Sequence, residues 1–350
     1  MEQITIREIA KLCGVGVSTV SRAINNHPDI NEETKTKILE TIRRYNYVPN
    51  NSARNLKRSE SRMIAVLVKG ISNPFFGTII QTLEREIVHD RYIFFLQQVE
   101  DSENEVEVAI QLEKEKRLKG IIFLGGMVTH SKDSLERLTV PYVISTVNME
   151  LPQDQESGAV VSIDDEEESC RLVSRLCEMG HRRIAILTAP ESDMSIGRSR
   201  LNGYRRALKD HGIESSEELI IHMKRDEVSY TLDCGYEMAR VLLERMQGKT
   251  LPDCVYGVSD TLAIGACKAL FDAGYRVPED ISVAGFDGLD IAEYYHPDIM
   301  TVCQPREQMA EETVRILLRM IRGKTVNRRV IFKAQIRDGA SVRKIQQENE

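Results

Sequence analysis

The stretch TIREIAKLCGVGVSTVSRAIN, residues 5–25, contains two short amphipathic segments separated by a glycine. Thr5 and Glu8 have the spacing of a capping box, in which a hydroxyl and a carboxylate satisfy the free N–H groups at the start of a helix. Gly14 follows the first apolar face and can adopt the positive φ angle that ends a helix. These features predict one helix from Thr5 to about Gly14 and a second helix soon afterwards.

The second predicted helix has an apolar inner face and a polar outer face. Its outward side chains are small, polar or cationic: Val17, Ser18, Ser21, Arg22 and Asn25. Two helices joined by about four residues with a glycine form a helix-turn-helix, which seats its second helix in the major groove of DNA. An ordinary three-helix core would show the same apolar pattern, so the pattern alone leaves both interpretations open.

A third helix is expected to follow, with Asn31 as its N-cap and with Leu39 and Ile42 as core contacts. The charge of this region differs from that of the rest of the chain. Residues 1–62 carry eleven basic and seven acidic residues, a net charge of +4, whereas the whole chain of 350 residues has a net charge of -7. A small basic head on an acidic body is typical of a protein that binds phosphate groups through the head.

Residues 49–58, PNNSARNLKR, form a short basic segment between this head and the body. A helix of this length is marginal in water, because nucleation is unfavourable and few residues propagate it. The segment is therefore expected to become helical only where something supports it, and a plain basic linker is the alternative.

After residue 62, short β-rich apolar runs alternate with amphipathic segments of helical length, which is typical of βαβ units and parallel sheets. Four strands are predicted in a first sheet: 63–68, 92–97, 120–124 and 142–145. A second series is predicted near Val160 and at 183–187, 219–222, 254–256 and 281–286. The fold class is therefore α/β, with an all-α head and two doubly wound parallel sheets in separate lobes.

Several classes of protein are disfavoured by the sequence. No apolar run is long enough for a membrane helix, and the start MEQITIREIA has no feature of a secretion signal, so we expect a cytoplasmic protein. Seven scattered cysteines lack a C-x-x-C pair and are interpreted as buried thiols. We find no catalytic motif and expect no enzyme, cofactor or metal; the acidic run 164–168 is interpreted as a solvated first turn of a helix, with a metal cluster as the alternative.

The segments TIREIAKLCGVGVSTVSRAIN and YNYVPNNSARNL, residues 5–25 and 45–56, resemble the head of the LacI/GalR family of transcriptional regulators almost position by position. The resemblance implies that Val17 and Ser18 discriminate bases and that Arg22 reaches a base edge. It places further contacts to the duplex at Thr5, Thr19, Ser21, Asn25, Thr34, Tyr47 and Asn50. One departure is Gly16, where the family usually has a serine cap; glycine is a tolerable N-cap.

The same resemblance gives the basic segment a role as a hinge. It implies that two hinge helices, one from each subunit of a homodimer, pack through Ala53 in the minor groove of a pseudo-palindromic operator. Leu56 would wedge into a base step, and Arg54 would add attraction to the phosphates. No heptad-rich tail at the C-terminus argues for tetramers.

The body also resembles the family's sensor, a bilobed fold like that of periplasmic binding proteins. The motif around Phe75 and Phe76 is shared, and these rings are either a ligand wall or core residues. The family's R-x-x-G-[YFW] element matches at Arg200, which implies contact with effector oxygens, and VPEDISVAGFD, residues 277–287, places Asp287 at the cleft. An N-cap role for Asp287 is the alternative.

Two further positions depart from the family and shorten the polar reach of the expected pocket. Thr146 stands where an aspartate is common, and Ser259 stands where the family often has asparagine; Asp260 is expected to cap the helix that follows. Both Thr146 and Ser259 are expected to line the ligand site. Because of these changes, the particular sugar that a relative binds cannot be assigned to this chain.

The resemblance covers nearly the whole chain and implies a DNA-binding domain at 1–48, a hinge at 49–61 and a sensor at 62–345. Lobe one is expected at 62–160 and 290–322, and lobe two at 161–289 and 323–345, with three crossings between them. The expected function is a repressor whose operator affinity is controlled by a small molecule, with a sugar favoured over a metabolite corepressor. A solute-binding protein and a sugar-metabolising enzyme are the rivals from other classes.

Overall fold

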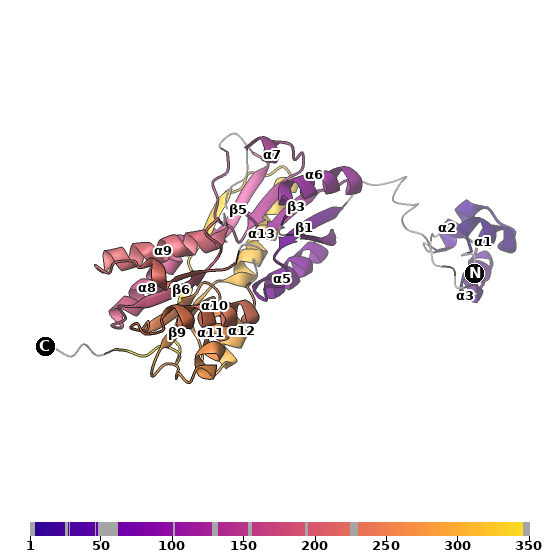
Figure 1. Ribbon diagram of the computed structural model, residues 1–350. Coiled ribbons are helices and arrows are strands. Elements are labelled where there is room, and N and C mark those ends of the chain that lie inside the picture. The colour runs from indigo at the N-terminus through magenta and orange to yellow at the C-terminus, as the bar shows by residue number, and fades with distance from the viewer. Residues whose placement is uncertain are drawn as a thin grey trace. The chain divides into compact units, whose positions relative to one another are not determined.

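The computed structural model describes residues 4–24, 27, 29–45, 47, 62–100, 102–127, 132–152, 156–192, 195–224 and 230–345. The chain divides into two compact units, Met1–Ser61 and Arg62–Glu350 (Figure 1). The predicted hinge at 49–61 lies outside the described residues, and so do Asn25, Asn50, Ala53, Arg54 and Leu56. Their roles stay predictions.

The first unit contains the three expected helices: α1 (Ile6–Cys13), α2 (Val17–Ile24) and α3 (Glu32–Arg44). The capping box at Thr5 and Glu8 is present, Gly14 ends α1 with φ +70°, and the Asn31 side chain caps α3. These three predictions are confirmed. In α3, however, Ile38 is the fully buried residue, whereas Leu39 is only half-buried. The 3.6-residue helical period brings both Ile38 and Ile42 to the face that packs on α1 and α2.

The second unit contains two six-stranded sheets, here called lobe one and lobe two. All neighbouring pairs in lobe one are parallel, in the order β11-β5-β4-β3-β1-β2. Its strands are β1 (Met63–Lys69), β2 (Ile93–Val99), β3 (Gly120–Leu124), β4 (Tyr142–Ser145), β5 (Gly158–Ile163) and β11 (Arg329–Phe332). The helices of this lobe are α5 (Phe75–His89), α6 (Glu105–Lys116), α7 (Lys132–Glu136) and α13 (Arg306–Ile321).

Lobe two has the order β12-β10-β9-β8-β6-β7, and only the β10–β12 pair is antiparallel. Its strands are β6 (Ile184–Thr188), β7 (Ile220–His222), β8 (Cys254–Gly257), β9 (Ser282–Asp287), β10 (Met300–Cys303) and β12 (Gln335–Arg337). Its helices are α8 (Asp165–Glu178), α9 (Ile196–Asp210), α10 (Leu232–Arg245), α11 (Asp260–Asp272) and α12 (Asp290–Tyr294), with a 3-10 turn at Glu217–Leu219. The predicted class of two doubly wound, mostly parallel sheets is confirmed.

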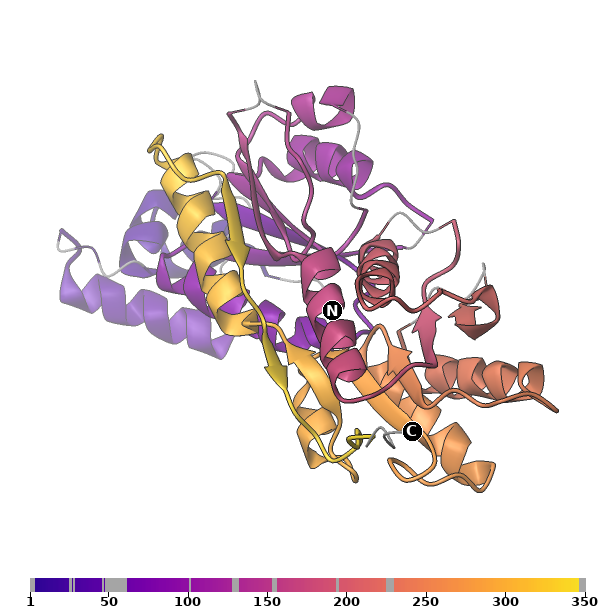
Figure 2. The ribbon, with the colours of Figure 1, turned by 90° about the vertical axis from the view of Figure 1, so that its left-hand side faces the viewer.

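The sheets divide the chain at places that differ from the predicted lobe boundaries. The strand near Val160, expected to open lobe two, is β5 of lobe one and pairs with β4 and β11. Strand β10 belongs to lobe two and β11 to lobe one, opposite to the assignments 290–322 and 323–345. The chain passes between the sheets after β5, after β10 and after β11 (Figure 2). The last three strands were missed because they have only three or four residues, and β11 and β12 carry polar side chains.

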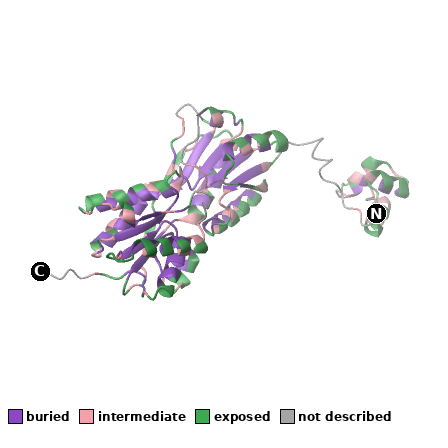
Figure 3. Ribbon diagram, viewed as in Figure 1, coloured by how far each residue is buried: buried purple, intermediate pink, exposed green. Residues whose placement is uncertain are grey.

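Burial follows the layered arrangement of the second unit. Most strands are buried between helices whose outer faces are exposed (Figure 3). The seven cysteines are free thiols; five are buried, as predicted, whereas Cys234 and Cys303 are half-buried. Within the described part of the chain, no helix is long and apolar enough to cross a membrane.

Candidate functional site

A cavity of about 320 Å³ lies at the carboxyl ends of the strands of both lobes. Lys69 ends β1, Thr146 follows β4 and Asp287 ends β9, which is where ligands bind in doubly wound sheets. The lining comprises Lys69, Gly70, Asn73, Phe75, Phe76, Gly125, Gly126, Met127, Thr146, Val147, Pro190, Ser192, Ser195, Ile196, Arg200, Tyr230 and Asp287. Five of the six residues expected at the ligand site are therefore brought together here; the sixth, Ser259, is not.

Arg200 is the central charged residue of this cavity and is only 1% exposed. Its Nε and Nη2 each lie 2.8 Å from Oδ1 of Asp165. Its Nη1 donates to the carbonyl of Val258 at 2.6 Å and to Oδ1 of Asp287 at 3.1 Å. The guanidinium carbon lies 3.7 Å from the centre of the Phe286 ring. The ring therefore covers one face of the guanidinium, while the hydrogen bonds hold its edges.

The charges in this cluster shift one another's pKa values. Burial alone would lower the pKa of Arg200, but Asp287 and Asp165 raise it above its usual value, so the guanidinium stays charged. Burial raises the pKa of Asp165 to about 6, against the opposing effect of Arg200. Burial also raises the pKa of Asp287, and Arg200 again opposes it.

Asp287 adopts φ +114°, an uncommon conformation for a residue with a side chain. Its Oδ1 accepts a second bond from Nε2 of Gln304 at 2.9 Å. The alternative interpretation as an N-cap does not hold, because α12 begins at Asp290 with Leu289 at the cap position and no side-chain cap. Asp287 therefore connects Arg200 to Gln304, which stands where the chain leaves lobe two for α13.

Phe75 and Phe76 satisfy both interpretations left open by the sequence. Their rings are edge-to-face with centres 5.4 Å apart, both line the cavity, and both belong to the hydrophobic core at 3% and 7% exposed. Gly125, with φ +73°, leaves room for the Phe76 ring beside the cavity. A Cβ at this position would come within 3.0 Å of the Phe76 ring and 2.8 Å of the Lys69 carbonyl. Thr146 accepts a hydrogen bond from the Gly125 N–H at 3.2 Å.

Ser259 and Asp260 have different roles from those predicted. Ser259, not Asp260, caps α11, and its hydroxyl also bonds to that of Thr261 at 2.8 Å. Asp260 is fully buried and accepts hydrogen bonds from Thr301 Oγ1 at 2.5 Å and from the Leu289 N–H at 2.6 Å. Burial first, and then the nearby Asp287, raise the pKa of Asp260 to about 7.

The acidic run 164–168 opens α8, with Asp164 as its N-cap, but it is not uniformly solvated as expected. Asp165 and Glu168 are both 3% exposed; Glu168 pairs with Arg171 and accepts from the Ala334 N–H at 3.0 Å. The first turn of α8 thus places these carboxylates at the favourable end of the helix dipole and beside a cation, the buried Arg200 for Asp165 and the partly exposed Arg171 for Glu168. Over the residues that the structure describes, no group of His, Cys, Asp or Glu is arranged to hold a metal ion.

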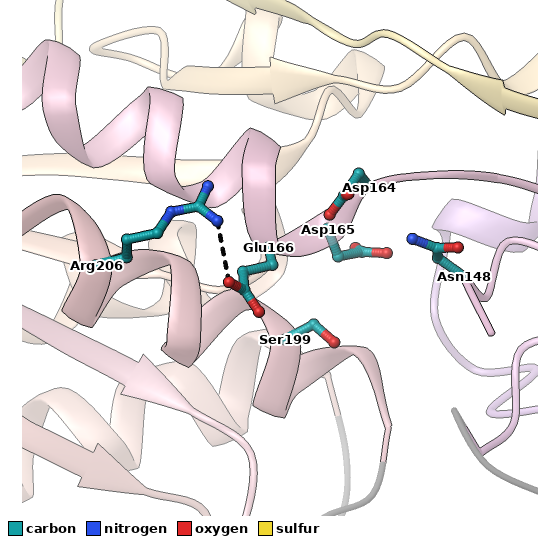
Figure 4. A pocket seen from close by; sticks show the side chains of 6 residues that line it. All are labelled: Asn148, Asp164, Asp165, Glu166, Ser199 and Arg206. Atoms are coloured by element: carbon teal, nitrogen blue, oxygen red, sulfur yellow. Dashed lines mark hydrogen bonds and ion pairs between the residues drawn. The ribbon is translucent and has the colours of Figure 1, made fainter. Parts of the chain in front are cut away.

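A second hollow, of about 280 Å³, is lined by Asp165 and neighbouring residues (Figure 4). Asn148 of lobe one faces Asp165 across it, and Arg206 pairs with Glu166 at 3.0 Å. Its lining is Asn148, Asp164, Asp165, Glu166, Ser199 and Arg206. The lining is almost wholly polar and charged, without the apolar wall of the first cavity, so the first cavity is the better candidate for a small-molecule site.

The charged and polar residues of the cavity and its supporting network that the sequence did not predict include Lys69, Asp165 and Gln304. Lys69 is the last residue of the apolar strand β1, which was a usable signal for a residue at the strand end. Asp165 was hidden among five consecutive acids, and Gln304 follows a strand too short to recognise.

In the first unit, three of the five side chains predicted on the outward face of α2 are exposed, whereas Ser21 is half-buried and Asn25 lies outside the described residues. Val17, Ser18 and Arg22 are exposed, whereas Val20 and Ala23 are buried against α1 and α3. Of the other expected DNA contacts, Thr5 is exposed, and Thr19, Ser21, Thr34 and Tyr47 are half-buried. This face therefore presents short polar side chains and one guanidinium, as a major-groove helix does.

Together the two units define a class of protein: a helix-turn-helix DNA-binding unit joined to a two-lobed small-molecule sensor. Residues 5–50 match the family of bacterial regulatory proteins of the lacI type, and residues 173–342 match the periplasmic binding protein-like domain. The HTH-type transcriptional regulator MalR of Clostridium butyricum is 39% identical over 333 residues, which cover 95% of this chain and 97% of that protein. The chain belongs to the LacI family and is a DNA-binding transcriptional regulator.

Two solved structures extend the comparison. The transcriptional regulator CelR in complex with cellobiose is 30% identical and matches with a TM-score of 0.68 over 97% of this chain and 99% of its own. The lac repressor dimer bound to operator and an anti-inducer matches with a TM-score of 0.75 over 98% of this chain and 100% of its own, and at 23% identity it supports the fold alone.

Proposed function

We propose that the chain is a repressor whose affinity for its operator is set by a sugar bound in the cavity of about 320 Å³ between the lobes. The observation that carries the proposal is the buried Arg200–Asp287 pair, which lies where the strand ends of the two lobes converge. Asp287 and Thr146 supply oxygen atoms for ligand hydroxyls, and Phe75 with Phe76 supplies an apolar wall for a sugar ring. The cellobiose complex of a relative supports this class of ligand.

The proposed DNA contacts are those of the exposed face of α2. Val17 and Ser18 are proposed to touch base edges, and Arg22, exposed in the last turn of the helix, has the fork of donors that recognises guanine. Thr5, Thr19, Ser21, Thr34 and Tyr47 are the proposed contacts to the sugar–phosphate backbone. The hinge residues, which lie outside the described ranges, are proposed to contact the minor groove.

Coupling between the cavity and the operator is proposed to pass through closure of the lobes. Asp287 contacts both Arg200 and Gln304, and Gln304 stands at a passage of the chain between the sheets. A ligand that binds one lobe arrangement better than the other changes operator affinity by the same factor as the operator changes ligand affinity, commonly worth about 1–3 kcal/mol.

A homodimer is the proposed assembly, by analogy with the lac repressor, which is a dimer on its operator. Large apolar side chains stand exposed on lobe one at Val88 and Ile93 and on lobe two at Ile291 and Tyr294. A second copy of the chain would cover such residues. Sedimentation equilibrium tests the assembly, and a monomer at micromolar concentration would contradict it.

We further propose that the protein acts in the cytoplasm, where bacterial operators are, and that it has no catalytic activity.

The decisive experiment is a gel-shift titration of operator fragments with the full chain, with and without members of a neutral carbohydrate panel. An effector is expected to change operator affinity at least fivefold in the wild type and to lose this effect in Asp287→Asn, which retains the shape of the side chain and its tolerance for positive φ. Asp233→Asn, on the exposed surface of α10, is the control and should respond as the wild type does. Failure to bind duplexes of any sequence at low ionic strength would refute the proposal.

A further inference from the structure

We infer that the cavity accepts an uncharged polyhydroxy ligand and rejects a phosphorylated or carboxylated ligand of the same size. The inference rests on the proposed function, in which this cavity is the effector site. Arginine and lysine in a cavity usually suggest an anionic ligand, and Lys69 and Arg200 both line this one. The contacts of these two cations point to the opposite preference.

The donors of Arg200 are already used by the protein. Of the five N–H groups of a guanidinium, one on Nε and one on Nη2 are directed at Asp165. Both N–H groups of Nη1 are taken, by the Val258 carbonyl and by Asp287. One N–H is left for a ligand, and a single donor suits a hydroxyl oxygen better than the two-oxygen edge of a phosphate or carboxylate.

The charge of Lys69 is neutralised by Glu105, a residue outside the cavity lining. Its Nζ donates to the Glu103 carbonyl at 2.7 Å and lies 3.5 Å from Oε2 of Glu105. The Glu105 side chain is 3% exposed and is not part of the lining, so a ligand meets the ammonium with its counter-charge already in place.

Three backbone amides of residues that line the cavity are also occupied. The Phe75 N–H, at the start of α5, donates to Oδ1 of Asn73 at 3.0 Å. The Gly125 N–H donates to Thr146, and the Met127 N–H donates to Oε1 of Glu105 at 2.9 Å. The residues of these three amides line the cavity, so at these three positions the N–H groups by which loops and helix N-termini bind phosphate are already used within the protein.

The balance of charge around the cavity disfavours a further negative charge. Three carboxylates, those of Asp287, Asp165 and Glu105, surround the two cations. Counting these five side chains alone, an added anion would therefore meet a net negative charge. A hydroxyl, by contrast, can donate to Oδ2 of Asp287, because Arg200 and Gln304 both donate to Oδ1.

Isothermal titration of the full chain with matched pairs tests this directly: cellobiose against cellobiose 6-phosphate, maltose against maltose 6-phosphate, and glucose against gluconate. A neutral sugar is expected to bind at least tenfold more tightly than its anionic partner, and its affinity should not change between 20 and 200 mM salt, about 20 to 7 Å in Debye length. An anionic member that binds within tenfold of its parent overturns the inference. So does a broad panel that yields only anionic ligands or no ligand.

A charge variant adds a gain-of-function test. Glu105→Gln keeps an acceptor for the Met127 N–H but leaves the Lys69 ammonium uncompensated. It is expected to bring the affinities for the phosphorylated and neutral partners at least threefold closer together. Glu107→Gln on the same helix, whose side chain is 48% exposed, is the matched control and should leave the ratio unchanged. An unchanged ratio in Glu105→Gln counts against the inference.

The operator titration separates this inference from the proposed function. If the chain binds operator and responds only to a phosphorylated sugar, the regulator stands and the inference fails. If the chain binds a neutral sugar but no duplex of any sequence, the inference about the ligand stands and the proposed function fails.

Discussion

Nη1 of Arg200 and Oδ1 of Asp287 lie 3.1 Å apart, although 87 positions separate the two residues in the chain. Each side chain is about 2% exposed, and Asp165 holds the opposite edge of the same guanidinium. The three residues come from α9, from the end of β9 and from the first turn of α8, so their contact depends on the complete assembly of lobe two. Burial of the cation is tolerable because both of its partners are charged and hydrogen-bonded.

A double-mutant cycle should measure the energetic coupling between Arg200 and Asp165. Arg200→Met leaves the Asp165 and Asp287 carboxylates buried without their partner, which costs about 3–5 kcal/mol in the free energy of unfolding. Asp165→Asn in the same chain removes one of the two unpaired buried charges. The free energy of unfolding of the double variant should therefore be at least about 1 kcal/mol higher than the sum of the two single effects predicts. Equilibrium urea unfolding measures all four proteins. Strict additivity would show that the pair is not energetically coupled.

A second prediction concerns the pH dependence of stability. The pKa of Asp260 is raised from 3.8 to about 7, so the folded chain binds this proton more tightly than the unfolded chain does. The corresponding contribution to the free energy of unfolding is fully present below about pH 4 and is lost as the pH rises through 7. Asp260→Asn should therefore lose less stability between pH 5 and pH 8 than the wild type, by at least about 1 kcal/mol.

The measurement is urea unfolding of both proteins at pH 5, 6, 7 and 8. Asparagine can accept from the Leu289 N–H and donate to the Thr301 hydroxyl, so the variant keeps the two hydrogen bonds of Asp260. The slope, rather than the absolute stability, is the informative quantity. Parallel curves for the two proteins would mean that Asp260 is ionised in the folded chain throughout this range.

A third prediction concerns the hinge. Leu56→Ala should leave the thermal melting of the sensor within about 1 °C of the wild type and weaken operator binding more than tenfold, because the wedge that kinks the duplex is lost. Lys57→Ala is the control: losing one phosphate contact should weaken binding to all duplexes evenly and reduce the salt slope by about one. Unchanged operator affinity in Leu56→Ala would contradict the proposed hinge.

Much of the fold could be predicted because its signals are local. The capping box at Thr5 and the glycine at position 14 specify where α1 begins and ends, and the apolar runs of β1, β3 and β4 mark strands buried on both faces. The strands after residue 299 could not be predicted in this way. They are short, and their pairing is set by partners more than a hundred residues away in the case of β11 and β5.

The candidate site was predictable to the extent that side chains follow strand ends or match a motif. Phe75, Phe76, Thr146, Arg200 and Asp287 were identified in that way and meet at one cavity. Charge compensation was not predictable. That Glu105 lies behind Lys69, and that Asp165 rather than solvent meets Arg200, are consequences of packing that no sequence spacing encodes.

The last prediction concerns Arg306, which contacts both lobes at the start of α13. Its Nη2 donates to the Gly288 carbonyl at 3.1 Å and to Asp290 at 2.9 Å in lobe two. Its Nη1 lies 3.4 Å from Oγ1 of Thr78 on α5 of lobe one. The Arg306 side chain is 13% exposed, whereas its partner Asp290 is 84% exposed, so the bonds to Gly288 and Thr78 are better shielded from solvent than the ion pair.

Arg306→Ala removes contacts made in this arrangement of the lobes and should shift the equilibrium away from it. We expect the ratio of operator affinities with and without effector to fall at least threefold, with little change in the melting temperature, because the contacts join the lobes rather than support either core. Arg322→Ala, which breaks a surface pair with Asp90 within lobe one, is the matched control. Gel-shift titrations at saturating effector measure the ratio. A wild-type ratio in Arg306→Ala would mean that closure does not depend on this contact.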